Sequence, residues 1–532
     1  MEAGTKTNVE KVENEKSESN KIGFFSCTSY VIGNIIGSGI FITPSGVLQS
    51  VDSVGLSLVV WISCGLISLL GAVVYIELGT SILEPGCDFA YMCYVKWRVL
   101  SLLISILSLL ESEVKDSNFF RTVFYRSPIA FAFMWVGVLL TYPASVAIQA
   151  QTFGRYLVEG FSPLYKLDPS YETFVETGIG LLLLAIIVWI NFYSLGEVVS
   201  KFQIVATIAK LGSMGLIIVG GLYWLLCKEV TQDLKKPMEH SNWNIVGIVL
   251  AFYAGLWSYA GWDVLNYGTT EVRNPRRNMP LSLITGITTV SLIYTAINVA
   301  YFAVMSVDEV KGTDAIAASF SQRVFGKFSY AIPFMVAILI CGTLNSNIFC
   351  ASRYMYAAAK EGHLPPFLSC INEGTGSPRP SLFAQGFLTF IMVFMDVTTL
   401  ISYVSFAMIL QRMVTMLALL YIRIRHIPVH EGAIRLPLVL TILFFLINLV
   451  LAVVPVIQNV KMTLISLVFL ASGIGIYFLL VRPKQLPGVF DTVNDFLTNW
   501  TMRIFDCKTD VKGMEVDKKT ENEEGNIEFS NS

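Results

Sequence analysis

Two charged residues, Lys210 and Asp263, lie inside runs of apolar residues that are otherwise suited to a lipid bilayer. Lys210 lies in IVATIAKLGSMGLIIVGG, and Asp263 directly follows a Tyr-Ala-Gly-Trp segment in IVLAFYAGLWSYAGWDVLNY. A charge at bilayer depth costs a few kcal/mol or more, so it persists only beside a partner or a water-filled cavity. The alternatives are a lysine whose stem reaches the membrane surface and an aspartate solvated at a helix break. We interpret both residues as functional.

Glycine clusters accompany these charges. Gly37-Ser38-Gly39 interrupts FFSCTSYVIGNIIGSGIFI, and the Tyr-Ala-Gly-Trp segment before Asp263 interrupts a second apolar run. Such clusters either allow close helix packing or let a membrane helix unwind and expose N–H and C=O groups, which lipid does not tolerate. Free N–H groups bind a carboxylate and free carbonyls bind an ammonium group. Because an α-amino acid carries both charges on one carbon, we expect a substrate site for amino acids or other small zwitterions.

The composition is that of a polytopic membrane protein. The 532 residues are 54% hydrophobic and 14% charged, and the mean hydropathy is +0.62. A soluble domain has about 25% charged residues. The net charge of -2 gives no basic stripe for nucleic acid. No metal-ligand spacing or catalytic constellation is present, so we expect no cofactor, no metal and no enzyme activity.

Apolar runs of about 20 residues predict an all-α protein with twelve transmembrane helices. Lys and Arg are more frequent in the loops that lie inside if both termini are cytoplasmic, which favours that orientation. Arg412 is expected near the cytoplasmic end of the tenth run, as an anchor at the membrane surface and not as a ligand. The broken runs are the first and sixth, five helices apart, as in a LeuT-like inverted five-plus-five repeat. The twelve runs centre on residues 22–48, 55–80, 128–156, 173–192, 199–226, 244–270, 281–305, 328–350, 381–395, 397–422, 436–458 and 461–480.

We divide the chain into a disordered cytoplasmic N-terminus (1–21), a transporter domain (22–480) and a cytoplasmic C-terminal tail (481–532). From about residue 508 the tail is too polar to pack and is expected to be disordered. Within the domain, residues 99–126 form an atypical insertion. Its apolar part is too short to span the bilayer, so it is either an interfacial helix or an intron retained in the gene model.

Four motifs give the chain a resemblance to the L-type amino-acid transporters, the light chains of heteromeric amino-acid transporters in the APC superfamily. The motifs are IIGSGIF in the first run, YIELGTSILEPGCDFAYM at the end of the second, WSYAGWDVLNYGTTEVRNPRRNMPLS in the sixth, and SRYMYAAAKEGHLPPFLSCINEGTGSPRPSL after the eighth. The resemblance extends from residue 22 to about 480. It implies transport of L-amino acids by alternating access, as an exchanger (antiporter) in the plasma membrane.

The resemblance also implies roles for individual residues. The backbone of the first run receives the substrate carboxylate, and the sixth run receives the amino group and carries an aromatic gate. Lys210 occupies the region where related sodium-coupled carriers hold an ion, linking the first and eighth helices. The implied substrate-binding residues are Ile36, Ser38, Gly39, Ile40, Trp257, Ser258, Ala260 and Asp263.

Two departures from the family pattern concern the substrate range. Asp263 stands where carriers of large neutral amino acids often have asparagine, and Gly-Trp-Asp resembles the subgroup that also carries cationic amino acids. Ala260 stands where the carrier of cystine and dibasic amino acids has an acidic residue, which argues against that exact chemistry, so the expectation of cationic substrates rests on Asp263. We therefore expect neutral and also cationic substrates.

The implied partner, a glycoprotein heavy chain, is joined in this family through a cysteine between the third and fourth helices. Residues 155–174 contain no cysteine, so we expect no disulfide-linked heavy chain. Cys227, which borders the next outer loop, is the alternative attachment point. Besides the exchanger, two other functions remain open: a heavy-chain-independent uniporter or proton-linked carrier, and a non-transporting amino-acid sensor.

Overall fold

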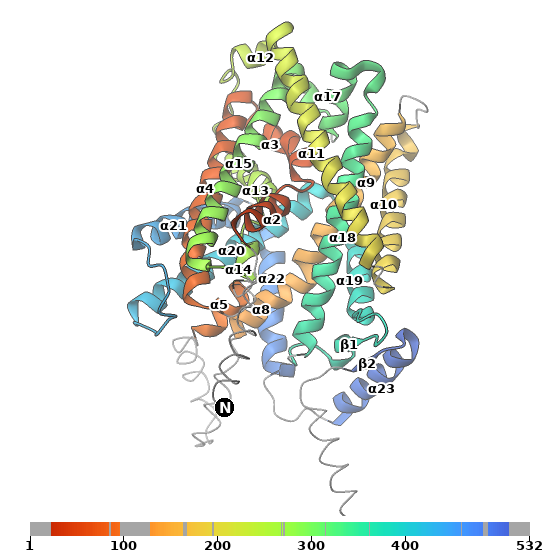
Figure 1. The fold of residues 1–532 in the computed structure, drawn as a ribbon, viewed down its shortest axis with the longest axis vertical. Coiled ribbons are helices and arrows are strands. Elements are labelled where there is room, and N and C mark those ends of the chain that lie inside the picture. The colour runs from red at the N-terminus through yellow and green to blue at the C-terminus, as the bar shows by residue number, and fades with distance from the viewer. Residues whose placement is uncertain are drawn as a thin grey trace, which may run out of the picture.

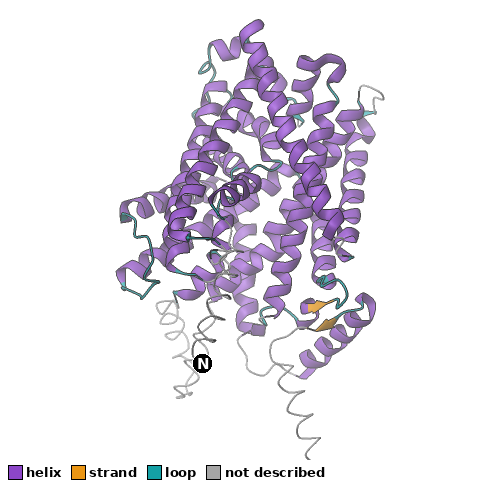
Figure 2. Ribbon diagram, viewed as in Figure 1, coloured by secondary structure: helices purple, strands orange, loops and turns teal. Residues whose placement is uncertain are grey.

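In the computed structural model the chain is a bundle of long helices with one two-stranded sheet (Figures 1 and 2). Helices α12 and α17 lie at one end of the bundle, whereas α5, α23 and the β1–β2 pair lie at the other (Figure 1). The structure describes residues 23–83, 87–95, 128–162, 168–193, 196–267, 269, 272–313, 315–360, 362–458, 460–481 and 488–509. The predicted insertion at 99–126 and N-terminal segment at 1–21 lie outside these residues.

Eight helical segments of the described chain are long and apolar enough to cross a membrane, and a bent pair brings the number to nine. A polytopic all-helical membrane protein is therefore confirmed. The eight segments are built from α4 (Val54–Ser81), α8 (Pro128–Val136) with the π-helical η1 (Gly137–Thr141) and α9 (Tyr142–Phe161), α10 (Pro169–Phe192), α11 (Gly196–Cys227), α15 (Pro275–Val304), α18 (Ala331–Lys360), α20 (Val397–Ile424) and α21 (Leu438–Gln458).

The bent pair is α2 (Phe24–Ile35) and α3 (Gly39–Val51), whose axes differ by 49°. The break falls on the predicted Gly37-Ser38 segment, where the chain leaves helical geometry because glycine weakens a helix interior. The sixth run is also broken: α13 (Ile245–Ser258) ends, a turn follows, and α14 (Val264–Tyr267) resumes the helix. Gly261 supplies the turn with a φ of 95°, which favours glycine.

The remaining predicted runs are shorter helices. The ninth corresponds to α19 (Arg379–Met392), and the twelfth to α22 (Val460–Ile476) continued by the π-helical η5 (Tyr477–Val481). Helices α13 and α19 have 14 residues each, and the apolar helical stretch of the twelfth run, Thr463–Leu479, is also short of the about 20 residues of a spanning helix. The twelve-helix count and the inverted repeat accordingly stay predictions.

Short elements connect the spans. They are α5 (Asp88–Tyr94), α12 (Gln232–Lys235), α16 (Val307–Lys311), α17 (Ile316–Phe325), the 3-10 helices η3 (Gly326–Phe328) and η4 (Pro366–Ser369), β1 (Cys370–Ile371), α23 (Gly488–Phe505) and β2 (Lys508–Thr509).

The last described residues correct one expectation. Lys508 and Thr509 were predicted to be disordered, but they form β2 and pair antiparallel with β1. Lys508 also forms an ion pair with Glu373 at 2.6 Å. The polar tail can therefore order here through backbone hydrogen bonds to an open strand edge, which need no apolar side chains. Residues 510–532 lie outside the described chain.

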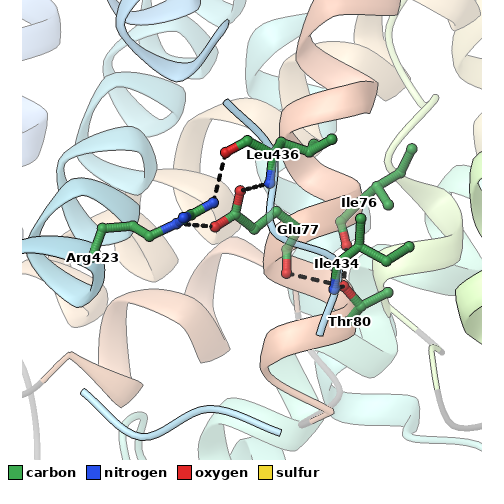
Figure 3. Close-up of polar contacts among 6 residues, drawn as sticks. All are labelled: Ile76, Glu77, Thr80, Arg423, Ile434 and Leu436. Atoms are coloured by element: carbon green, nitrogen blue, oxygen red, sulfur yellow. Dashed lines mark hydrogen bonds and ion pairs between the residues drawn. The ribbon is translucent and has the colours of Figure 1, made fainter. Parts of the chain in front are cut away.

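Glu77, near the end of α4, binds both the end of α20 and the loop between α20 and α21 (Figure 3). Its carboxylate accepts hydrogen bonds from Arg423 Nε at 2.5 Å and from the Leu436 N–H at 3.0 Å. One turn later, Thr80 Oγ1 accepts from the Ile434 N–H at 3.0 Å. Because Glu77 is 3% exposed, this buried pair ties α4 and α20 together at one end of the bundle.

Candidate functional site

The two helix breaks face each other inside the bundle. Asn34 Nδ2, in the last turn of α2, donates to the Gly261 carbonyl at 2.8 Å. The Tyr294 hydroxyl, from α15, lies 3.1 Å from the Ile35 carbonyl and 3.2 Å from the Ser258 carbonyl. A single buried tyrosine therefore bridges the end of α2 and the end of α13.

Beyond the breaks, α3 and α13 are in direct contact. The hydroxyls of Thr43 and Ser258 are hydrogen-bonded at 2.6 Å. Gly39 lies so close to α13 that a β-carbon there would come within 2.7 Å of Ser258 Cα. Glycine at position 39 is therefore required for this close approach, the packing role that the sequence left open beside unwinding.

One polar group at the first break, the Ser38 hydroxyl, has no hydrogen-bond partner within the described residues. Ser38 precedes α3 but makes no capping hydrogen bond to it. Its hydroxyl is buried. The first N–H groups of a helix carry a partial positive charge. The start of α3 thus offers an unpartnered hydroxyl and a helix N-terminus to an anion.

The eight predicted substrate-site residues divide into two groups in space. Ile36, Ser38, Gly39 and Ile40 are buried at the first break, and Ser258 adjoins them across the α3–α13 contact. Trp257 and Ala260, which flank Ser258 in the sequence, are half-buried. Asp263 lies two residues beyond Gly261 and belongs to a different cluster, described below.

Lys210 contacts the first broken helix directly. Its Nζ donates to the Gly33 carbonyl of α2 at 2.9 Å, and the residue is 8% exposed. The ammonium group is thus anchored one turn before the break. Helix α11, which carries it, packs against both α18 and α15. The predicted contact with the first helix is present, whereas the link from the ammonium to the eighth helix stays a prediction.

Asp263 lies beside Asp88 and Cys87. One oxygen of each carboxylate and the Cys87 sulfur lie within 4.8 Å of one another. Asp88 is already hydrogen-bonded by the Tyr75 hydroxyl at 2.5 Å, and by Gln411 Nε2 and Thr415 Oγ1 at 2.8 Å each.

The cluster also has a cation nearby, Arg412. Its Cζ lies 5.1 Å from the centre of the Trp262 ring, and the residue is 6% exposed. A position near the end of its helix, as an interfacial anchor, was expected; this is wrong, because Arg412 lies in the interior of α20. The cation and the hydrogen bonds already made to Asp88 both disfavour a metal ion in the cluster.

Sequence reasoning overlooked Asp88 and misplaced Arg412. Asp88 lies within the motif YIELGTSILEPGCDFAYM. An aspartate that follows the end of a predicted helix is usually interpreted as a solvated loop residue. The signal for Arg412 was available: it lies midway along an apolar run and not at its flank.

A cavity of about 540 Å³ opens beside α3, α9, α13 and α20. Thr43, which bonds Ser258, lines it, so the cavity extends to the contact between the two broken helices. Arg155, Asp396 and Lys461 place charges of both signs on its walls. Because the walls carry both positive and negative charge, the cavity repels neither the carboxylate nor the ammonium group of an entering zwitterion.

Comparison with known proteins assigns this arrangement to a family. The sequence profile described as "Amino acid permease" matches residues 22–482. The chain is 41% identical over 474 residues to Amino acid transporter protein 6 of Caenorhabditis elegans, covering 89% of this chain and 85% of that protein.

Two human proteins are also similar. The cystine/glutamate transporter is 33% identical over 479 residues, which cover 90% of this chain and 88% of that protein. The b(0,+)-type amino acid transporter 1 is 33% identical over 466 residues, covering 87% and 88%. Each of the three names describes a carrier of amino acids.

Proposed function

This chain belongs to the amino acid permease family and its L-type branch, is a multi-pass membrane protein that transports amino acids, and is not an enzyme. From that premise we propose that it exchanges neutral, and also cationic, L-amino acids by alternating access. The fold proposed with this mechanism is the twelve-helix inverted repeat, in which the breaks of the first and sixth helices meet at mid-membrane.

The observation that carries the proposal is the pair of facing breaks with an unpartnered hydroxyl at Ser38. The substrate carboxylate binds the Ser38 hydroxyl and the N–H groups at the start of α3, along Ile36 to Ile40. The substrate ammonium binds carbonyls at the end of α13, near Trp257, Ser258 and Ala260. Trp257 is half-buried beside this position and acts as the aromatic gate.

Lys210 holds the first break in shape. Its ammonium contacts the Gly33 carbonyl at the end of α2, as a bound cation would. We therefore propose that neutral substrates are carried without sodium, the lysine supplying the fixed positive charge.

Asp263 is proposed to accept a cationic substrate side chain. Asp88 reinforces its negative charge and Arg412 opposes it. With both carboxylates ionised, Asp263, Asp88 and Arg412 together carry a net charge of −1. This charge favours a cationic substrate side chain over an anionic one. Asp263 lies five residues beyond Ser258, and the substrates proposed to contact it are lysine and arginine, whose charge stands at the end of a long side chain.

The protein is proposed to act in the plasma membrane with both termini cytoplasmic and without a disulfide-linked heavy chain. The loop at 155–174 lacks cysteine, and Cys227, although exposed, lies at the end of α11. Non-reducing gels of the full chain from cells should show no adduct. A reducible band that Cys227→Ser removes would contradict this and identify the attachment point.

Uptake by proteoliposomes tests the function. Labelled leucine, arginine and glutamate are offered to vesicles that are empty or preloaded with unlabelled amino acid, with and without sodium. An exchanger takes up leucine and arginine only when preloaded, and without sodium. Equal uptake by empty vesicles would favour the uniporter, stimulation by a pH gradient the proton-linked carrier, and binding without uptake the sensor.

A further inference from the structure

Helix α23 (Gly488–Phe505) has three distinct faces. Thr498 and Thr501 are buried against the rest of the protein, whereas Asp495, Asn499 and Arg503 are exposed to the surroundings. The third face is exposed and apolar. Its residues recur at the helical spacing of three and four, and their exposed fractions are Val493 50%, Phe496 67%, Trp500 56% and Ile504 54%.

The buried face fixes where α23 lies. Phe505 packs between Phe192, at the end of α10, and Phe383, in the first turns of α19, with ring centroids 5.8 and 5.6 Å away. Arg379 Nη1 donates to the Phe505 carbonyl at 2.7 Å. The helix is therefore held at the ends of two helices of the bundle, beside β1 and β2 (Figure 1).

That position is the level of the membrane surface. Trp189 and Tyr193, at the same end of α10, are 59% and 51% exposed and contact each other with ring centroids 5.5 Å apart. Arg379 lies 5.8 Å over the Tyr193 ring. Exposed Trp and Tyr beside Arg on spanning helices mark the boundary between acyl chains and headgroups.

The exposed apolar face of α23 continues the lipid-facing surface of α19. Phe383, which contacts Phe505, is itself 54% exposed, and Phe387 one turn further along α19 is 56% exposed. These residues face acyl chains because α19 belongs to the membrane domain. The contact between Phe383 and Phe505 thus brings the lipid-facing surface of α19 to the end of α23.

We propose that α23 is an interfacial helix, embedded in the bilayer leaflet at this end of the bundle with Val493, Phe496, Trp500 and Ile504 in the acyl–headgroup boundary. An interfacial helix has an apolar face for the acyl chains and a polar face for the headgroups and water. Helix α23 has both, and its third face holds it to the protein. Its charged residues include both Asp495 and Arg503, so binding depends on apolar contact and does not need anionic lipid. The leaflet thereby holds the β2 strand against β1, and with it the loop that follows α18.

Site-specific photocrosslinking tests the proposal in the full-length protein. The variants Phe496→p-benzoylphenylalanine and Asp495→p-benzoylphenylalanine are reconstituted in vesicles of phosphatidylcholine that carries an alkyne on its acyl chain. Both positions are exposed, but they lie on the apolar and the polar face. After irradiation, position 496 should give at least about fivefold more lipid adduct than position 495.

Three results would overturn the proposal. They are equal lipid labelling at the two positions, a crosslink from position 496 to a second copy of the chain, and a crosslink from position 496 to another segment of the same chain.

A milder variant covers the case in which the photoreactive residue prevents folding. Trp500→Phe keeps the apolar face, and subtracting its fluorescence from that of the natural protein isolates the Trp500 emission. Lipid brominated near the headgroup should quench that emission, and aqueous iodide should not. Quenching by iodide alone would place Trp500 in water and refute the interfacial position.

Discussion

Gly39 and Ser258 are in backbone contact: a β-carbon added to Gly39 would come within 2.7 Å of Ser258 Cα. The starting turn of α3 and the last turn of α13 are therefore pressed together without an intervening side chain. This contact holds the two broken helices in register, and it limits which residues can stand at position 39.

Gly39→Val and the milder Gly39→Ala should abolish or strongly reduce uptake and lower the thermal-unfolding midpoint. Overpacking of this kind costs about 1–3 kcal/mol. Gly215→Ala is the control, since Gly215 is an exposed glycine within α11 and a β-carbon there meets nothing within 4 Å. Equal uptake by the Gly39 and Gly215 variants would show that the contact is not needed for transport.

Lys210→Ala should reduce uptake at least about tenfold, because the carbonyl of Gly33 loses the buried cation that holds the end of α2. Lys228→Ala removes an exposed lysine just after the same helix and should transport normally. Initial rates are compared in sodium and in choline buffer. Normal, sodium-independent uptake by Lys210→Ala would show that Lys210 has no role in transport.

Asp263→Asn should weaken competition by arginine and lysine while leaving competition by leucine unchanged. A charge pair in a cavity of intermediate dielectric is worth a few kcal/mol before desolvation, and a net of about 1.4 kcal/mol shifts affinity tenfold. Inhibition constants against labelled leucine measure this. An equal loss for arginine and leucine would assign Asp263 to the structural cluster with Asp88 and Cys87 instead.

Glu77→Ala should destabilise the protein by about 1–3 kcal/mol, because it leaves Arg423 Nε and the Leu436 N–H without their acceptor, while Arg423 Nη2 keeps the Leu436 carbonyl. The thermal-unfolding midpoint of purified protein reports this loss. Glu431→Ala, an exposed glutamate in the same loop, serves as the control. An unchanged midpoint for Glu77→Ala would mean that the α4–α20 link contributes little to stability.

The features that sequence could predict are those with a local cause. Gly37 lies in a Gly-Ser-Gly cluster and Gly261 in a Tyr-Ala-Gly-Trp segment, and both breaks fall at these local sequences because glycine weakens a helix interior. Lys210 was recognised because a charge in an apolar run stands out without knowledge of its neighbours.

The features that sequence could not predict depend on distant partners. Asp88 is significant only because Gln411 and Thr415 on α20 reach it, more than 300 positions along the chain. The order of Lys508 and Thr509 likewise depends on the open edge of β1. Neither residue type nor local spacing carries that information.

The central claim, that the substrate carboxylate binds at the first break, is tested most directly by the affinity of purified Ser38→Ala for labelled leucine. Ser38 and Ser57 are both buried with unpartnered hydroxyls, but Ser57 lies in α4. Removing either hydroxyl leaves no broken protein hydrogen bond, so both variants should fold. A hydrogen bond to a charged group is worth about 1.5–3 kcal/mol, which predicts an affinity about tenfold or more lower for Ser38→Ala and unchanged for Ser57→Ala. Natural affinity in Ser38→Ala would contradict the site.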